Sequence, residues 1–295
     1  MRAKASSIYG SDAETGSGSR TFSVGGHALP VPRLVPGLYL VATPIGNLAD
    51  ITLRALETLA GADLIACEDT RITHRLTERY AIAAQLTPYH EHNAAAARPK
   101  ILEKLAQGAA VALVSDAGTP LISDPGFKLV REACAAGHAV VAIPGPSSVL
   151  TALSVAALPT DRFFFEGFLP SRQGARRTRL AELARIDASL VMFESGNRVQ
   201  DALADLAEIM GDREAAICRE LTKLHEEVTR APIAELASSA GKLETRGEFV
   251  LVIGPPAAGS TVMAESELDE VLRASLSRDS VKDAVAHAVE VSGRP

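Results

Sequence analysis

The sequence predicts an α/β protein with two α/β domains, and three observations support this fold class. Short apolar segments alternate with helical patterns along most of the chain. These segments are apolar nearly throughout, which is typical of parallel strands buried on both faces of a sheet. The length of 295 residues also exceeds the usual size of one hydrophobic core, so we expect two domains with flanking segments.

The predicted organisation has four parts. Residues 1–36 are rich in Gly, Ser and Pro without periodicity, so we expect a flexible or loosely attached tail. Residues 37–145 form the N-terminal α/β domain and residues 146–256 the C-terminal one. Residues 257–295 are a linker followed by a helical stub that is too small for a core of its own.

The composition is that of an ordinary globular protein without a membrane segment. Hydrophobic residues make up 47% and charged residues 22% of the chain. No apolar run approaches the roughly 18 residues that cross a bilayer, and the N-terminus lacks the apolar core of a signal peptide. We therefore expect a cytoplasmic protein that does not contact a membrane. The net charge of -6 means that any contact with nucleic acid requires a local basic patch.

The first half contains the clearest alternation of strands and helices. A helix is expected to begin at Asp50 as N-cap and to end at Gly61. The expected strands are Leu38–Thr43, Asp63–Cys67, Ala110–Val114 and Ala139–Ile143, and further helices are expected at Arg98–Gln107 and Phe127–Ala136.

The second half repeats the alternation. A Phe-rich segment, Phe163–Phe165, leads into the loop Gly167–Pro170. Expected elements are strands at Ser189–Phe193, Ala215–Cys218 and Glu248–Ile253, and helices at Val199–Met210, Glu267–Leu276 and Ser280–Val291. Ser280 and Asp283 are placed for a capping box at the start of the last helix.

Polar and glycine-containing motifs follow the carboxyl ends of strands, the edge at which open α/β sheets bind ligands. They are Thr43–Asn47, Glu68–Arg71, Ser115–Pro120 and Pro144–Ser148. The first turn has one glycine and no Walker lysine, which disfavours a dinucleotide or a nucleoside triphosphate. A ligand without phosphates fits better, with Asp116 facing a cation or hydroxyls and with Ser147 and Ser148 as donors at a helix start. Taken singly, each of these residues has a turn or a cap as its alternative role.

Other side chains allow several roles. Glu68 and Asp69 end a strand side by side, so we expect one to line the site and the other to cap a helix. The run Tyr89–Asn93 contains His-x-His, but no second cluster has ligand spacing, so we expect hydrogen bonding rather than a metal. The 3 cysteines form no C-x-x-C pair, so we expect free thiols buried in apolar segments, at Cys67, Cys134 and Cys218.

The densest basic segment follows the Phe168 loop. It contains Arg172, Arg176, Arg177 and Arg179 without an acidic residue. We expect it to grip phosphates, and its alternative is a solvated helix face. Because aromatic residues make up only 4% of the chain and tryptophan is absent, a broad base-stacking platform is not expected.

Taken in order, these motifs resemble the small-subunit (16S) ribosomal RNA methyltransferase I family of the tetrapyrrole-methylase superfamily. The resemblance extends over roughly residues 37–255 and rests on many ordered motifs. They are Ala42–Leu48, Asp50–Leu56, Glu68–Arg71, Tyr89–Asn93, Ser115–Pro120, Ile122–Gly126, Pro144–Ser147, Leu158–Phe163, Glu166–Pro170 and Arg219–Glu227. One departure is Gly196-Asn197, where the family commonly has Pro-His. Residues 267–291 resemble part of the family's C-terminal helix-turn-helix, and the chain ends before that unit would be complete.

The resemblance implies a homodimer of two-domain subunits with S-adenosylmethionine in a cleft between the domains. The implied activity is methylation of the 2′-hydroxyl of a cytidine in the decoding region of 16S rRNA in the small ribosomal subunit. The implied cofactor residues are Thr43, Pro44, Ile45, Asp116, Thr119, Ser147, Ser148, Glu194 and Leu221. Candidates for activating the ribose hydroxyl are Glu68, Asp69, His90, Glu91, Glu220 and Lys223. Arg71 joins the arginine segment as an expected RNA contact.

Two alternatives remain at this point. A porphyrinoid (precorrin-type) methyltransferase would use a related fold and the same cofactor. A non-catalytic RNA-binding ribosome-assembly factor would not need an intact cofactor edge, so cofactor binding would distinguish it from the enzymes.

Overall fold

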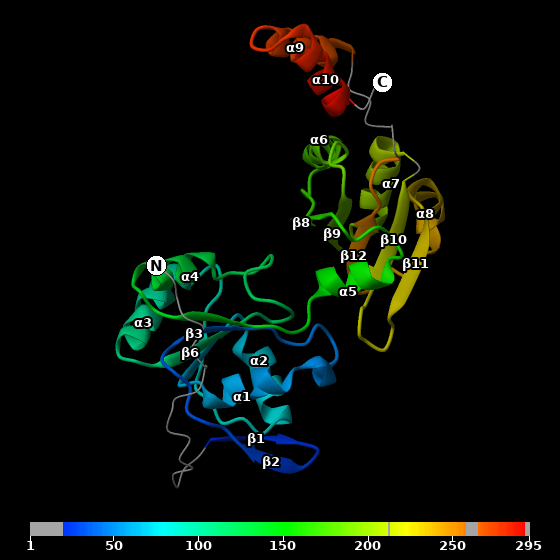
Figure 1. The fold of residues 1–295 in the computed structure, drawn as a ribbon. Helices are drawn as coiled ribbons and strands as arrows, with labels where there is room; N and C mark the ends of the chain where they lie inside the picture. The colour runs from blue at the N-terminus through cyan, green and yellow to red at the C-terminus, as the bar shows by residue number, and fades with distance from the viewer. Residues whose placement is uncertain (1–19, 212, 258–264, 293–295) are drawn as a thin grey trace. The chain divides into compact units, whose positions relative to one another are not determined.

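The computed structural model describes residues 20–211, 213–257 and 265–292. Its contacts divide the chain into two compact units (Figure 1). The first unit is Met1–Thr151 together with Leu221–Leu224, and the second is Ala152–Glu220 together with His225–Pro295. The division therefore falls after Thr151 rather than after residue 145, and a short segment of the second half of the sequence belongs to the first unit.

The first unit is built on a five-stranded sheet with the order β5-β4-β6-β3-β7. All of its strand pairs are parallel, as the apolar segments predict. The strands are β3 (Gly37–Val41), β4 (Leu64–Cys67), β5 (Leu86–Pro88), β6 (Ala110–Val114) and β7 (Val140–Ile143). The helices are η1 (Leu48–Asp50), α1 (Leu53–Gly61), α2 (Thr70–Arg79), α3 (Ala94–Ala106), α4 (Phe127–Ala135) and α5 (Ser148–Val155), which crosses the division between the units.

Helices cover both faces of this sheet because successive strand residues point to opposite sides. On β6, Ala112 and Val114 pack in one core with residues of α1 and α2. Val111 and Leu113, which alternate with them, pack in a second core with residues of α3 and α4. The two buried faces fix the strand register and hold the carboxyl ends of the strands at a common edge.

Residues 20–36 are not a loosely attached tail, so that part of the prediction is wrong; residues 1–19 lie outside the described residues. The strands β1 (Thr21–Val24) and β2 (His27–Pro30) form an antiparallel hairpin. Phe22, Val31 and Leu34 are buried in the same core as α1. This burial anchors the segment although it has no periodicity that a sequence pattern would reveal.

The second unit contains a mixed sheet with the order β11-β10-β12-β9-β8. Only the β8–β9 pair is parallel among these described strands; the other pairs are antiparallel. The strands are β8 (Phe163–Phe168), β9 (Ser189–Ser195), β10 (Glu214–Arg219), β11 (Glu227–Pro232) and β12 (Glu248–Ile253). The helices are α6 (Gln173–Leu183), α7 (Val199–Met210), α8 (Ile233–Ser239), η2 (Ala240–Lys242), α9 (Glu265–Leu276) and α10 (Val281–Ser292).

The observed helix ends show which of the predicted N-caps are correct. Ser280 caps α10 as predicted, because its hydroxyl accepts from the Asp283 backbone N–H at 3.3 Å. The Asp283 carboxylate accepts from that hydroxyl at 2.6 Å, so the second bond of the pair joins the two side chains. The predicted cap Asp50 is wrong, since it lies in η1 and Thr52 caps α1 instead.

Cys134 is exposed, which corrects the expectation of a buried thiol there. Among the helices described, none is long and apolar enough to cross a membrane.

Candidate active site

Three of the predicted strand-end loops meet at the carboxyl edge of the first sheet. Thr43 and Gly118 exchange two backbone hydrogen bonds, of 2.9 and 3.0 Å. The Thr119 hydroxyl donates to the carbonyl of Pro146 at 3.3 Å, which ties the Ser115–Pro120 loop to the Pro144–Ser148 loop. The sheet therefore assembles residues that are far apart in the sequence into one surface.

The loop Thr43–Asn47 is covered by the segment Leu221–Leu224. Ile45 is 8% exposed, and a Cβ on Gly46 would lie 2.4 Å from Cγ of Lys223. Leu221, in the same segment as Lys223, is also buried. The aliphatic part of Lys223 thus rests on the Gly46 backbone, and only glycine leaves room for it.

The serines of the fourth motif lie at the start of α5, as expected. The Ser147 hydroxyl accepts a hydrogen bond from the backbone N–H of Leu150 at 3.5 Å. The Ser147 carbonyl accepts a bond from the hydroxyl of Thr151 at 2.8 Å. Ser147 therefore caps the helix, while Ser148 is its first residue.

A pocket of about 510 Å³ lies at the same edge. It brings together three of the predicted site residues from different strand ends, Glu68, His90 and Asp116. The full lining is Glu68, Asp69, Thr70, Arg71, Pro88, His90, His92 and Asp116. Thr70 and His92 lie within the quoted motifs Glu68–Arg71 and Tyr89–Asn93 but were not singled out as site residues, and Pro88 directly precedes the second motif.

The neighbouring carboxylates Glu68 and Asp69 have different environments. Asp69 caps α2 by accepting from the Arg71 backbone N–H at 2.8 Å, and its carboxylate pairs with the Arg71 guanidinium at 2.5 Å. These contacts lower the pKa of Asp69 to about 2, so it stays ionised and is a weak base. This confirms that one of the two residues caps a helix.

Glu68 has the opposite shift. Burial raises the pKa of Glu68, and the carboxylates of Asp116 and Asp124 raise it further. Burial likewise raises the pKa of Asp116, although its carboxylate accepts a hydrogen bond from the Asp69 backbone N–H at 2.9 Å. A pocket with such carboxylates favours a positively charged ligand and provides a base closer to neutral pH. Asp124 was missed as a contributor, although it lies in the quoted motif Ile122–Gly126.

His90 is held by its backbone rather than by its ring. Its N–H donates to the Asn93 side chain at 2.8 Å, and its Nδ1 is buried without a hydrogen-bond partner among the described residues. Its ring lies 6.1 Å from that of His92 in an edge-on arrangement. Glu91 is exposed and does not line the pocket. In the described part of the chain, no group of three or more His, Cys, Asp or Glu side chains is arranged to hold a metal ion.

Comparison with known proteins identifies the family. Residues 37–237 match the family model of tetrapyrrole (corrin/porphyrin) methylases. The chain is 48% identical over 272 residues to ribosomal RNA small subunit methyltransferase I of Mesorhizobium japonicum, with 92% of each chain covered. It is 44% identical over 247 residues to the Vibrio cholerae protein of that name, covering 82% of this chain and 84% of the relative. The chain belongs to the ribosomal RNA small subunit methyltransferase I family.

A solved structure shows the same fold at much lower identity. Uroporphyrin-III C-methyltransferase from Thermus thermophilus, complexed with S-adenyl homocysteine, superposes with a TM-score of 0.54. The two chains are 20% identical, and the match covers 74% of this chain and 97% of that one. Together with the family match over residues 37–237, this likeness confirms the predicted tetrapyrrole-methylase fold.

Two expected site residues of this family member lie in the second unit. Glu194, on β9, is 2% exposed; it accepts from the Ser195 backbone N–H at 2.8 Å and lies 3.3 Å from the Arg198 guanidinium. Glu220 has a positive φ of 50° and accepts from the Glu248 backbone N–H at 3.0 Å. Both carboxylates thus have partners within the second unit.

The arginine segment is a helix, α6, and its side chains are mostly neutralised. Arg176 is 3% exposed and pairs at 2.6 Å with Asp205, a buried residue of α7, so its predicted role in gripping RNA is wrong. Arg177 pairs with both Asp205 and Glu208. Arg179 pairs with Glu166 at 2.7 Å and with Glu182 at 2.6 Å. Only Arg172, exposed at the N-cap of α6, keeps its expected role as a prediction.

Proposed function

We propose that the protein transfers the methyl group of S-adenosylmethionine to the ribose 2′-hydroxyl of a cytidine in the decoding region of 16S rRNA. One observation carries this proposal: 48% identity to a ribosomal RNA small subunit methyltransferase I, over 92% of both chains. The pocket with Glu68, His90 and Asp116 lies within the matched region and supplies the groups that such a transfer requires.

The residues at the strand-end edge fit this methyl donor. The donor carries a sulfonium charge, and burial together with neighbouring acids raises the pKa of Asp116 and of Glu68. A cation beside these carboxylates relieves their mutual repulsion. The loops meeting there are tied together by backbone hydrogen bonds and by the Thr119 hydroxyl. The residues assigned to the donor are Thr43, Pro44, Ile45, Asp116, Thr119, Ser147, Ser148 and Leu221, with Glu194 from the second unit.

When bound, S-adenosylmethionine supplies an electrophilic methyl group, so the protein has to position the ribose and accept its proton. Glu68 and His90 are the candidates that line the pocket and are able to accept a proton. Asp69 is too weak a base beside Arg71, and Glu91 does not line the pocket. Lys223 lies across Gly46 and is assigned to shaping the donor loop. We assign acceptance of the 2′-hydroxyl proton, as the S–methyl bond breaks and the O–methyl bond forms, to the Glu68 carboxylate or to the His90 imidazole.

The test is methyl transfer from labelled S-adenosylmethionine to small ribosomal subunits that lack the modification. Digestion of the product RNA should place the label on one cytidine 2′-oxygen. Naked 16S rRNA and a porphyrinoid are the comparison substrates. Label on the porphyrinoid alone would favour the precorrin-type alternative. Cofactor binding without any transfer would favour a non-catalytic assembly factor. The homodimer that the resemblance implies stays a prediction, which sedimentation equilibrium would check.

A further inference from the structure

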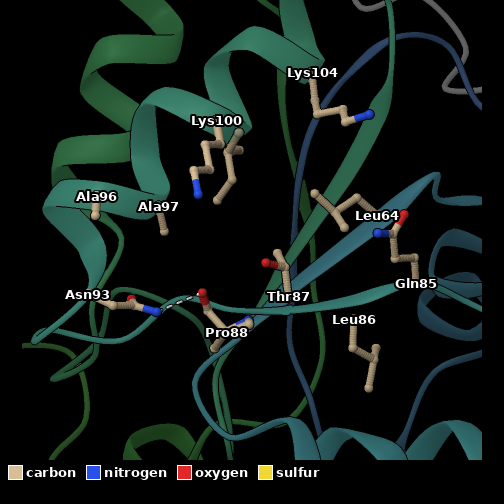
Figure 2. A pocket seen from close by; sticks show the side chains of 11 residues that line it. Leu64, Gln85, Leu86, Thr87, Pro88, Asn93, Ala96, Ala97, Lys100 and Lys104 are labelled. Atoms are coloured by element: carbon tan, nitrogen blue, oxygen red, sulfur yellow. Dashed lines mark hydrogen bonds between the residues drawn. The ribbon is translucent and has the colours of Figure 1, made fainter.

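A second pocket lies at the open edge of the first sheet, between α3 and β5 (Figure 2). Its volume is about 350 Å³. It is lined by Leu64, Gln85, Leu86, Thr87, Pro88, Asn93, Ala96, Ala97, Lys100, Ile101 and Lys104. Because β5 is the last strand of its sheet, one of its backbone edges has no partner strand among the described residues and faces this space.

The polar groups of this second pocket favour an anion. Lys100 and Lys104 are four residues apart and therefore share one face of α3. Both are exposed, and within the described part of the chain no hydrogen bond or ion pair engages either ammonium group. None of the described residues that line the pocket is acidic. Gln85 and Thr87 add neutral polar side chains from the strand side (Figure 2).

The backbone of β5 contributes a further donor. The Gln85 carbonyl accepts from Ile65 N–H at 2.8 Å, and Tyr89 N–H donates to the Cys67 carbonyl at 2.7 Å, both toward β4. Backbone groups alternate in direction along a strand, so the N–H of Leu86 points to the open edge. The space is thus bordered by two cations, polar side chains and a backbone N–H.

The second pocket adjoins the candidate active site. Pro88 lines both pockets. Asn93, in the wall of the second pocket, donates to the Pro88 carbonyl at 2.9 Å, as the dashed line in Figure 2 marks, and accepts from the His90 N–H at 2.8 Å. One side chain therefore fixes the turn that carries His90 into the first pocket and forms part of the second.

The two adjoining pockets have opposite charge. The first is lined by the carboxylates Glu68, Asp116 and Asp69, of which only Asp69 is paired with the Arg71 guanidinium in its wall, and the second is lined by two lysines. An RNA strand alternates uncharged riboses with anionic phosphodiesters, and a ribose tolerates carboxylates where a phosphate does not. We propose that the second pocket holds the backbone phosphate adjacent to the target ribose, with Lys100 and Lys104 as its cationic contacts. This inference rests on the proposed function and names how that site engages its RNA.

An acidic protein needs a local basic patch to bind RNA. The arginines of α6 are already paired with carboxylates, so they add little net charge. Two unpaired lysines beside the reacting ribose provide a local basic patch of the kind that the net charge of -6 requires. Because these lysines bind the phosphate next to the target ribose, they also favour an RNA strand that continues beyond the target nucleotide.

The test compares the Lys100→Ala, Lys104→Ala double variant with a matched control, Lys128→Ala, Lys242→Ala. The control removes the same charge from exposed lysines that line neither pocket. Binding to small ribosomal subunits is measured from about 50 to 200 mM salt, the range over which counterion effects are resolved. Loss of the contact to this one phosphate should flatten the log–log slope of the pocket variant, relative to that of its control, by about 0.7–0.9. The same relation gives roughly 5- to 8-fold weaker binding near 0.1 M salt.

Cofactor affinity and kcat should stay within about twofold of the parent, because the lysines are assigned to RNA alone, while KM for the subunit rises. Lys100→Arg, Lys104→Arg should restore the slope. A slope equal to that of the control would overturn the proposal. Self-association of the alanine variant at unchanged subunit affinity would also overturn it, since the lysines would then only guard the open edge of β5. The salt slope is measured on binding and does not depend on methyl transfer. If the parent protein transferred no methyl group, the proposed function would be refuted, and the comparison of slopes would still test the phosphate pocket.

Discussion

The buried carboxylate Asp205 permits a test of the structural role that takes Arg176 away from RNA binding. Asp205 is 1% exposed and accepts hydrogen bonds from Gln173 at 3.2 Å, Arg176 at 2.7 Å and Arg177 at 2.8 Å. Asp205→Ala would leave the guanidinium of Arg176, itself 3% exposed, without its buried counter-charge. Breaking a buried pair in this way costs about 3–5 kcal/mol.

A matched control lies in the same unit. Arg162 and Asp187 form an ion pair at 3.4 Å in which both side chains are 72% exposed. Exposed pairs contribute about 0–1 kcal/mol, so Asp187→Ala should have little effect. Urea unfolding at neutral pH, followed by circular dichroism, gives the free energy of unfolding for both variants and the parent. A loss for Asp205→Ala no larger than that for Asp187→Ala would refute the assignment of Asp205 as a buried structural anchor.

The pH dependence of stability gives an independent check on Asp205. Burial opposes its ionisation, but the donors from Arg177, Arg176 and Gln173 prevail, so the pKa of Asp205 is lowered. Its contribution should therefore be complete above the unfolded-state value of about 3.9 and should be lost as pH falls through the folded-state pKa. Asp205→Ala should lack this acid-dependent loss. In a separate binding experiment, Arg177→Ala should leave the salt slope of subunit binding unchanged, because the ion pair with Asp205 already neutralises the charge of Arg177.

The remaining predictions concern the site and one close backbone approach. Asp116→Asn should weaken S-adenosylmethionine binding by about 10- to 100-fold, the equivalent of a charged hydrogen bond of about 1.5–3 kcal/mol, as measured by calorimetry; unchanged affinity would remove Asp116 from the cofactor site. Glu68→Gln and His90→Ala should each keep cofactor affinity but lower kcat by about 10²–10⁴-fold. If Glu68 is the base, the rate of the parent should fall as the pH drops through the raised pKa of Glu68. Glu68→Gln should lack this fall in rate at low pH. If the fall persists in Glu68→Gln, Glu68 is not the base and His90 is the remaining candidate. Gly196→Ala should destabilise the fold by about 1–3 kcal/mol, because its Cβ would lie 1.5 Å from the Thr245 carbonyl. Gly174→Ala, where nothing lies within 4 Å, should be neutral or stabilising, and equal effects of the two would show that the Thr245 loop yields freely.

Local pattern alone determined much of the first unit. Continuous apolar runs such as Ala110–Val114 predicted a parallel sheet because such strands are buried on both faces. The motifs at their carboxyl ends predicted one site, since parallel strands end at a common edge. A helix cap at Glu68 or Asp69, which the structure assigns to Asp69, and the cap at Ser280 also followed, because those contacts join residues a few positions apart.

The tertiary structure decided what depends on partners distant in sequence. Arg176 looked like a free cation because its counter-charge, Asp205, lies on another helix. Phe22 lies in a segment without periodicity and is ordered by burial against α1. Lys223 belongs to the first unit because it packs on Gly46. Lys100 is a candidate phosphate contact only because α3 packs beside the open edge of β5. Periodicity reports which residues a helix or strand will bury, whereas the partner of a charged side chain is fixed only when those elements pack together.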